Sequence, residues 1–206
     1  MNHFRTRLLA LLLLCWASGA LPAQDPAPRV THTATITTTA GTIEIELYGS
    51  DAPKAVQNFS ALAAKKFYNG ILFHRVIAGT VIQAGDPLTR DPAKRDEWGT
   101  GGESSFGTPF ADELNPASLS YQRGYVQGTV AMANRGPNTN TSQFFIMLAD
   151  NTTLRRPLEK RYTIFGRVVR GLETVQAIGR GAIADKPRGL PVAPVSITAI
   201  TVTPVR

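Results

Sequence analysis

Cysteine and histidine are scarce in this chain, and their scarcity excludes most metal and thiol chemistry. Among 206 residues there is one cysteine, Cys15, and three histidines, at positions 3, 32 and 74. Cys15 falls in an apolar N-terminal stretch, so the remainder of the chain can form no disulfide, thiol nucleophile or cysteine-based metal site. His74 is the single histidine in the body of the chain, and one histidine cannot build a zinc site of the usual kind. We therefore expect neither a metal nor a cofactor.

Three further functional classes lack their sequence signatures. No nucleophile-elbow motif accompanies any serine near His74, which argues against a serine hydrolase. The cluster Gly99–Gly102 has no Lys-Ser or Lys-Thr pair after it and no strand–loop–helix context, so it predicts a tight surface loop rather than a phosphate-binding loop. The formal charge of +7 is scattered, without the dense basic stripe and interleaved aromatics of a nucleic-acid interface. No nucleic-acid partner is expected.

The apolar run near the N-terminus, Leu8 to Trp16, is too short to span a membrane. Arg5 and Arg7 precede this run, and small residues follow it up to Ala20 and again at Ala23. This is the layout of a secretory signal peptide over the first 23 residues, with cleavage after Ala20 or Ala23. Because no twin-arginine pair is present, general secretion is favoured over export of a folded protein.

Two alternatives to a cleaved signal are an uncleaved membrane anchor and a lipoprotein site at Cys15. Leu14 disfavours the lipoprotein site, because a small residue is expected before a lipidated cysteine. Residues 24–34 are polar and contain proline, which predicts a linker. Residues 35–206 then form one domain without an internal repeat. We expect an exported protein, with the bacterial periplasm as the compartment most compatible with a chain that lacks disulfides.

The domain is rich in glycine (18 in the chain) and proline (14), which favours turns and a β-rich fold. Polar and apolar residues alternate on both sides of Ala40-Gly41, which predicts a hairpin over residues 35–47. Asp51 and Pro53 predict the start of a helix, with Asp51 as the cap, and a second helix is predicted over residues 172–178. Further strands are predicted over residues 71–77, 81–83, 125–133, 143–148, 162–169 and 195–202. The total is about seven or eight strands and two helices.

One arginine lies inside an apolar segment, Phe73-His74-Arg75-Val76-Ile77. A guanidinium is always charged and carries five donors, so Arg75 must hold a carboxylate, a carbonyl or a ligand. A buried ion pair is one interpretation, and a donor aimed at a bound substrate is the other. His74 alternates with Arg75 and should face the opposite side of the strand, so a structural role is expected for it.

Five segments resemble the motifs of cyclophilins, in the same order along the chain. They are Phe73–Ile77, Gln83–Asp86, Gly99–Gly102, Met132–Phe145 and Tyr162–Val168, and the resemblance covers residues 35–203. It implies a peptidyl-prolyl cis-trans isomerase of a mainly β fold, a closed eight-stranded antiparallel barrel capped by two α-helices. The site should lie on the outer face of this barrel, and proline-containing polypeptides would be the substrates of a monomeric enzyme.

The resemblance also assigns roles to individual residues. Arg75, Gln83 and Phe145 match the catalytic positions, with Phe145 as the floor of the proline pocket. The positions that match the substrate-binding groove are, in chain order, Thr80, Val81, Gly99, Ala133, Asn134, Arg135, Gln143, Thr153, Leu154 and Tyr162. From the residues alone, Gln83 and Asn134 could hold the substrate backbone and Gln143 could contact or orient Arg75. Tyr162 stands where many members have histidine, and in this respect the chain resembles the exported bacterial branch.

Three departures from the cyclophilin pattern affect the pocket. Thr80 and Val81 replace an aromatic residue and a methionine, and the tryptophan expected after the strand of Phe145 is missing. An ungapped comparison with the family pattern places Thr153 at the position of the tryptophan and Leu154 next to it. The charged residues that follow lengthen this loop, which makes Leu158 an alternative to Leu154. An aromatic-to-threonine change gives up about 1–3 kcal/mol of apolar contact. We therefore expect a shallower, more polar pocket, reduced turnover and weak cyclosporin binding.

Prolyl isomerisation explains why an arginine would be needed. A peptide bond resists rotation by about 18–20 kcal/mol because nitrogen donates its lone pair to the carbonyl. In the twisted transition state the nitrogen regains that lone pair, and Arg75 can donate a hydrogen bond to it. Since arginine stays charged, the rate should not depend on pH near neutrality. The alternative function is a weakly active cyclophilin-fold peptide-binding protein or chaperone that uses the same groove.

Overall fold

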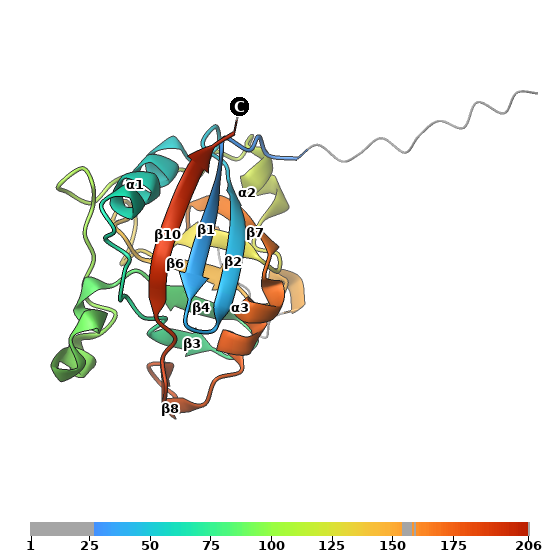
Figure 1. Cartoon of the computed structure of the whole chain (residues 1–206). Coiled ribbons are helices and arrows are strands. Elements are labelled where there is room, and N and C mark those ends of the chain that lie inside the picture. Colours follow the sequence, from blue (N-terminus) through green and yellow to red (C-terminus); the bar gives the residue numbers. More distant parts are fainter. Residues whose placement is uncertain (1–26, 154–157, 159, 206) are drawn as a thin grey trace, which may run out of the picture.

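Figure 1 shows a computed structural model of the chain, which describes residues 27–153, 158 and 160–205. The predicted signal peptide, the first residues of the predicted linker and Leu154 lie outside the described residues. Within the described part, no helix is long and apolar enough to cross a membrane.

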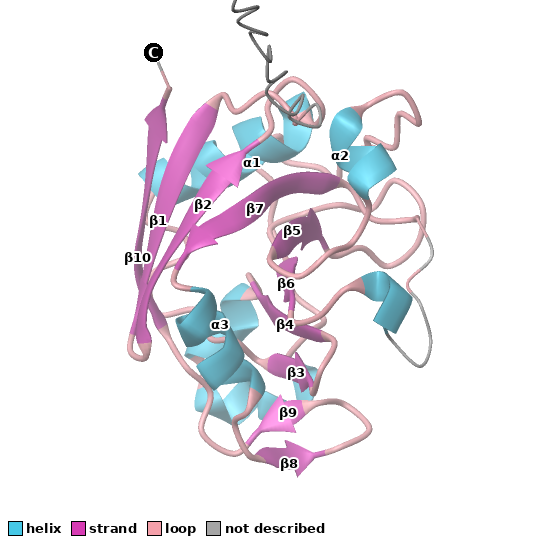
Figure 2. Ribbon diagram, turned by 90° about the vertical axis from the view of Figure 1, so that its right-hand side faces the viewer, coloured by secondary structure: helices cyan, strands magenta, loops and turns pink. Residues whose placement is uncertain are grey.

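Eight antiparallel strands form one curled sheet in the order β10-β1-β2-β7-β5-β6-β4-β3 (Figure 2). The strands are β1 (His32–Thr38), β2 (Gly41–Leu47), β3 (Arg75–Ile77), β4 (Val81–Ala84), β5 (Thr129–Met132), β6 (Phe144–Met147), β7 (Ile164–Arg170) and β10 (Ile197–Pro204). The alternating hairpin predicted around Ala40-Gly41 is confirmed as β1 and β2, in which Ile36 lies opposite Ile43. β1 begins at His32, so ordered pairing starts inside the stretch expected to be a linker.

The prediction of a closed barrel is wrong, because the two edge strands, β3 and β10, do not share a ladder. β3 has only three residues, although a strand was expected over residues 71–77. The N–H of Val76 donates to the carbonyl of Gly189 at 2.8 Å, so the outer edge of β3 is already occupied. The chain ahead of β3 meets the start of β10 through an isolated bridge between Leu72 and Ser196, with backbone hydrogen bonds to residues 195 and 197 but no continuous ladder. The result is an open, curled sheet.

Three α-helices, three 3₁₀ helices and a small hairpin complete the described fold. They are α1 (Pro53–Ala64), α2 (Leu119–Arg123), α3 (Leu172–Gly179), η1 (Pro87–Arg90), η2 (Pro92–Glu97), η3 (Asn151–Thr153), β8 (Ile183–Asp185) and β9 (Leu190–Pro191). α1 and α3 are the two helices expected from the sequence, and they lie toward opposite ends of the sheet (Figure 1). The other elements are too short to show a periodic pattern, and they were not predicted.

The prediction that Asp51 caps α1 is wrong. The cap position is Ala52, and Pro53 occupies the first turn as expected. The free N–H groups of Lys54 and Ala55 donate to the two carboxylate oxygens of Glu113, at 2.9 and 3.0 Å. Asp51 instead accepts from the N–H of residue 120. Glu113, 58 positions from Ala55 in sequence, therefore caps the helix in place of the neighbouring Asp51.

The core lies on the concave side of the sheet, beneath α1. The ring of Phe59 in α1 lies edge-on to that of Phe144, with centroids 5.6 Å apart, and is tilted against that of Phe165 at 5.5 Å. Along β4 and β6 the residues that enter this core are Ile82, Ala84, Phe144 and Ile146, all fully buried. Since side chains alternate along a strand, the residues between them face the opposite side of the sheet. That outer side carries the candidate site.

Candidate functional site

Strand register places the three candidate catalytic residues in one row on the outer side of the sheet. Arg75 of β3 pairs with Gln83 of β4, and Gln83 pairs with Phe145 of β6. Ala131 of β5 continues the row opposite Phe145. Residues two positions away in a strand share the same side, so Val81 and its partners, Ile77 of β3 and Met147 of β6, form a second row beside the first. The structure thus brings together residues that are far apart in the sequence.

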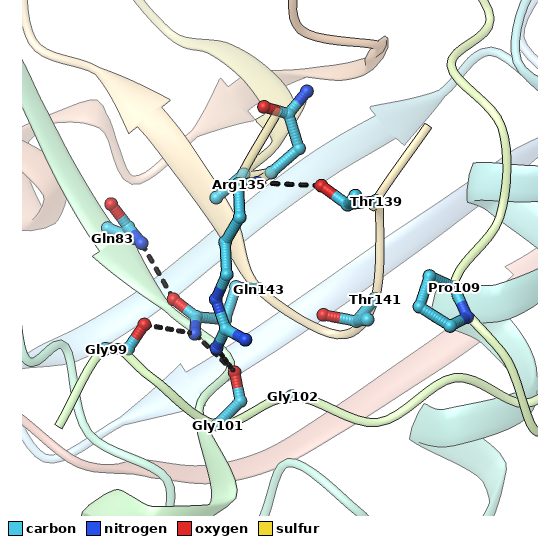
Figure 3. Close-up of a pocket in the computed structure, with 11 residues that line it drawn as sticks. Gln83, Gly99, Gly101, Gly102, Pro109, Arg135, Thr139, Thr141 and Gln143 are labelled. Carbon is cyan, nitrogen blue, oxygen red and sulfur yellow. Dashed lines mark hydrogen bonds between the residues drawn. The ribbon is translucent and has the colours of Figure 1, made fainter. Parts of the chain in front are cut away.

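A relay of hydrogen bonds holds the Arg75 guanidinium. Its Nη1 donates to Oε1 of Gln83 at 3.1 Å, and Nε2 of Gln83 donates to Oε1 of Gln143 at 2.8 Å. Nε2 of Gln143 in turn donates to the carbonyls of Gly99 and Gly101, at 3.1 and 2.6 Å (Figure 3). Gln143 therefore orients Arg75 through Gln83, whereas direct contact was also considered from the sequence.

The alternative interpretation of Arg75, a buried ion pair, finds no support in the structure. Among the residues that the structure describes, no carboxylate lies within salt-bridge distance of its guanidinium; the ion pairs found there are Arg170–Glu44 and Arg188–Asp96. Arg75 is half-buried, and one of its five donors is taken by Gln83. Among the described residues no other hydrogen-bond acceptor is found for this guanidinium, so its remaining donors are available to a bound molecule.

A pocket of about 210 Å³ adjoins the guanidinium; its floor is apolar and its rim is partly polar, and it is named the apolar pocket after its floor. Its floor is Phe145, which is 4% exposed, and the ring of Tyr162 meets the Phe145 ring edge-on with centroids 5.4 Å apart. The lining residues are Arg75, Ile77, Thr80, Val81, Gln83, Ala133, Asn134, Phe145, Leu158 and Tyr162. All of these except Ile77 and Leu158 were site residues expected from the sequence.

Leu158 occupies the place for which the sequence offered alternatives. It lines the pocket, and its N–H donates to Oδ1 of Asn151, which ties the loop to η3. Thr153 lies in η3, but its side chain and all of Leu154 are outside the described residues. Ile77 was missed, although its position two residues after Arg75 on the same strand would have placed it on the same side.

A second hollow, of about 220 Å³, lies on the other side of Gln83 (Figure 3). It shares Gln83, Ala133 and Asn134 with the apolar pocket and contains the expected Gly99, Arg135 and Gln143. Its remaining lining residues, none of which was individually expected from the sequence, are Gly101, Gly102, Pro109, Thr139 and Thr141. The two threonines lie inside the matched segment Met132–Phe145. Their spacing of two positions could have predicted that both side chains face the same side.

Arg135 reaches across this second hollow. Its backbone N–H donates to the hydroxyl of Thr139 at 2.8 Å, and its Nη2 donates to the carbonyl of Gly101 at 3.1 Å. Asn134 is expected to hold the substrate backbone, and its side-chain amide donates to the carbonyl of Arg161 at 3.0 Å. The carboxamide of Asn134 therefore also stabilises the rim of the groove, and Gln83 and Asn134 both line the two hollows.

Tyr125 fixes the position of Tyr162 from below. The Tyr125 hydroxyl donates to the carbonyl of Tyr162 and accepts from its N–H, both at 2.9 Å. Burial raises the pKa of Tyr125 to about 12, so the phenol keeps the proton that it donates. Both tyrosines and Phe145 thereby form a continuous apolar wall.

His74 faces the interior, as its alternation with Arg75 indicated. Its side chain is 1% exposed, and Nδ1 lies 3.4 Å from the carbonyl of Leu72. Desolvation lowers the pKa of His74 and outweighs the opposing field of Asp86. A neutral, buried imidazole fits the expected structural role. No group of three or more potential metal ligands occurs in the described part of the chain.

The comparisons with known proteins agree with one another. Residues 33–202 match the family described as cyclophilin type peptidyl-prolyl cis-trans isomerase/CLD. Peptidyl-prolyl cis-trans isomerase 10 of Caenorhabditis elegans is 44% identical over 156 residues, which cover 76% of this chain and 87% of the relative. Peptidyl-prolyl cis-trans isomerase-like 3 of Gallus gallus is 42% identical over 153 residues, or 74% and 84% of the two chains.

Solved structures give the same answer for the fold. A crystal structure of a cyclophilin type peptidyl-prolyl cis-trans isomerase from Cryptosporidium parvum has a TM-score of 0.70 and 35% identity, and covers 85% of this chain and 99% of that one. Its crystal structure in the presence of the dipeptide Ala-Pro has a TM-score of 0.69 and 35% identity, with coverage of 83% and 98%. Because the family match extends over most of the sequence and the relatives and structures carry the same description, this chain belongs to the cyclophilin-type family of peptidyl-prolyl cis-trans isomerases.

Proposed function

We propose that this protein accelerates the rotation of X-Pro bonds in exported polypeptides, and that Arg75 stabilises the twisted transition state. The observation that carries the proposal is the position of the guanidinium. It lies at the edge of an apolar pocket, held at one N–H by Gln83 and paired with no carboxylate among the described residues. A proline ring on Phe145 would bring the imide nitrogen toward the donors that Gln83 leaves open.

Each part of the site then has one task. The apolar pocket binds the proline ring through Phe145, Val81 and Tyr162. Arg75 donates to the nitrogen only when its lone pair is restored, so the interaction is stronger in the transition state than in the planar ground state. Gln83 keeps the guanidinium in place before the substrate arrives, which limits the reorganisation needed during rotation. No covalent step is required.

The proposal that the substrates are exported chains rests on the first 23 residues and on Tyr162. The signal-peptide pattern lies outside the described residues. Tyr162 stands where many cyclophilins have histidine, and a tyrosine at this position resembles the exported bacterial branch. Expression of the full chain in a secreting host, followed by mass spectrometry of the product, tests this part. A mature N-terminus at Leu21 or Gln24 supports export, whereas an intact N-terminus in the cytosol contradicts it.

The test of the mechanism is the Arg75→Ala variant in a protease-coupled assay with an Ala-Pro peptide. Removal of a transition-state donor should lower kcat/KM by about 10²–10³-fold. Arg170→Ala is the matched control, because Arg170 is an exposed arginine that pairs with Glu44 away from the site. Its rate should equal that of the wild type.

Two results would contradict this mechanism in different ways. If Arg75→Ala keeps the wild-type rate, the guanidinium is not the catalytic donor. If wild type and variant share the same negligible rate but still bind the peptide, the protein is a peptide-binding protein or chaperone that uses the groove. The substitution of an aromatic residue by Thr80 at the pocket rim is the observation that favours this second function.

A further inference from the structure

A buried carboxylate lies beneath the glycine loop, Gly99–Gly102, that lines the second hollow. Asp86 follows β4 and is fully buried. Oδ1 accepts from the N–H of Leu88 at 2.8 Å, and Oδ2 accepts from the N–H groups of Gly99 at 2.6 Å and Gly101 at 3.1 Å. No cation lies within salt-bridge distance of it among the described residues. Backbone donors from a distant loop thus take the place of an ion pair.

The same loop is held from its opposite side by the active-site amides. The carbonyls of Gly99 and Gly101 both accept from Nε2 of Gln143, and that of Gly101 also accepts from Arg135 (Figure 3). The loop therefore lies between the Asp86 carboxylate and the Gln143 carboxamide. Its N–H groups point to one and its carbonyls to the other.

The contacts continue without a gap to the guanidinium. Gln143 accepts from Gln83, and Gln83 accepts from Nη1 of Arg75. An amide side chain can rotate by 180° and exchange its donor and acceptor ends. In this relay the two loop carbonyls require the NH₂ of Gln143 on their side, which leaves its oxygen for Gln83. The orientation of the loop thereby determines which end of Gln83 faces Arg75.

We propose that Asp86 is a positioning residue for the isomerisation site, which holds Arg75 in its reactive orientation through the loop at Gly99–Gly101, Gln143 and Gln83. The inference rests on the proposed function of Arg75. The charge of the carboxylate matters, because hydrogen bonds to an ionised acceptor are about twice as strong as neutral ones. The close approach of the loop to the carboxylate also requires glycine. An ideal Cβ on Gly101 would lie 2.1 Å from Oδ1 of Asp86, so any other residue would push the loop away.

The experiment compares Asp86→Asn with Asp91→Asn. Both carboxylates cap a 3₁₀ helix in the same way, since Oδ1 of Asp91 accepts from the N–H of Ala93 at 2.9 Å at the start of η2. Asp91 is exposed and its side chain does not contact the glycine loop. An asparagine at position 86 would place its NH₂ group against an N–H of Gly99 or Gly101 and so lose a hydrogen bond to the glycine loop. An asparagine at position 91 weakens only the local helix cap.

We expect Asp86→Asn to lower kcat by about tenfold while KM for an Ala-Pro peptide changes less than about threefold, because the proline pocket itself is untouched. The side-chain Nε–H resonance of Arg75 should shift in its NMR spectrum. Asp91→Asn should show neither effect. In an Arg75→Ala background, Asp86→Asn should cause no further loss, because its effect passes through the missing guanidinium.

A folded Asp86→Asn protein with wild-type kcat, or a loss of the same size in the Arg75→Ala background, overturns the inference. If Asp86→Asn does not fold, Gly101→Ala provides the same test, since its methyl group displaces the loop from the carboxylate and leaves the relay side chains unchanged. Wild-type kcat in Gly101→Ala then overturns it. A wild-type rate in Arg75→Ala alone overturns the proposed function instead, so the two failures are distinguishable.

Discussion

At the scale of single residues, two neighbouring side chains lie in opposite environments: the Arg75 guanidinium borders the pocket, whereas the His74 imidazole is buried. This division follows from the alternation of side chains along an extended chain, whereas the other site residues were assigned by the resemblance to cyclophilins. The partners of each residue were less predictable. The carboxamide of Asn134 holds the rim of the groove, and Gln143 reaches Arg75 only through Gln83. An amide has two donors and an acceptor, and the sequence does not say which neighbours use them.

Thr80 reduces the apolar surface of the pocket relative to the aromatic residue expected at this position. It is half-buried at the rim, next to Val81, at the position where an aromatic residue was expected. We predict that Thr80→Phe lowers KM for proline peptides and increases the affinity for cyclosporin, because an aromatic ring restores about 1–3 kcal/mol of apolar contact. Calorimetric titration with cyclosporin and steady-state kinetics would measure the two effects.

The control for this variant is Thr80→Val, which removes the hydroxyl without adding a ring. Its affinity for cyclosporin should stay close to that of the wild type. Equal affinities for Thr80→Phe and the wild type would show that the missing tryptophan, rather than Thr80, limits the pocket.

At the scale of elements, regular patterns were predictable and long-range partners were not. The β1–β2 hairpin, α1 and α3 follow from alternation, helical spacing and Pro53 in the first turn of α1. The cap of α1 did not follow, because Glu113 comes from a distant loop. β3 was predicted too long for the same reason. Its apolar run continues ahead of Arg75, but the backbone there bonds to residues 195 and 197, at the very start of β10, as an isolated bridge rather than a ladder.

The approach of β9 to β3 supports the strand that carries Arg75 at its outer edge. Gly189, next to β9, has φ +72°, and an ideal Cβ there would lie 2.7 Å from the carbonyl oxygen of Val76 and 3.3 Å from Cγ of Arg75. We predict that Gly189→Ala destabilises the protein by about 1–3 kcal/mol and lowers kcat, since the methyl group must displace β3 or the Arg75 side chain. Urea unfolding and peptide kinetics would measure both.

Gly107→Ala separates these contacts from backbone strain. Gly107 has φ +79°, similar to Gly189, but an added Cβ would meet nothing within 4 Å. This control should lose stability through strain alone and keep its turnover. If both variants lose turnover equally, or neither does, the contact between Gly189 and Arg75 has no role in catalysis.

At the scale of the whole molecule, the curled sheet separates the apolar core on its inner side from the candidate site on its outer side. Core residues such as Phe144 and Ile146 pack beneath α1, while Phe145 between them faces the groove. The sequence motifs predicted the family and this separation, but not the open edge between β3 and β10. Closure of a barrel depends on whether the last two edges meet, and here Gly189 occupies one of them.

The same separation predicts different responses of stability and turnover to pH. Burial holds the pKa of His74 below its ordinary value of 6.5, with the field of Asp86 as a smaller opposing effect. As the pH falls below about 6.5, the unfolded chain takes up a proton that the folded protein does not, and the free energy of unfolding decreases. This loss should continue until the pH reaches the pKa of the folded state. Each unit of separation between the two pKa values contributes about 1.4 kcal/mol.

Turnover should remain constant over the upper part of this range, because Arg75 stays charged and the lowered pKa of His74 keeps its imidazole neutral there. Urea unfolding at pH 7.5 and 5.5, with peptide kinetics at the same values, would measure both. His74→Phe should reduce the difference in stability between the two pH values, whatever its own stability, whereas His32→Phe should leave that difference unchanged. A wild-type difference that persists in His74→Phe would assign the acid sensitivity to another group, and a kcat that follows the stability curve would show that the imidazole acts on the site.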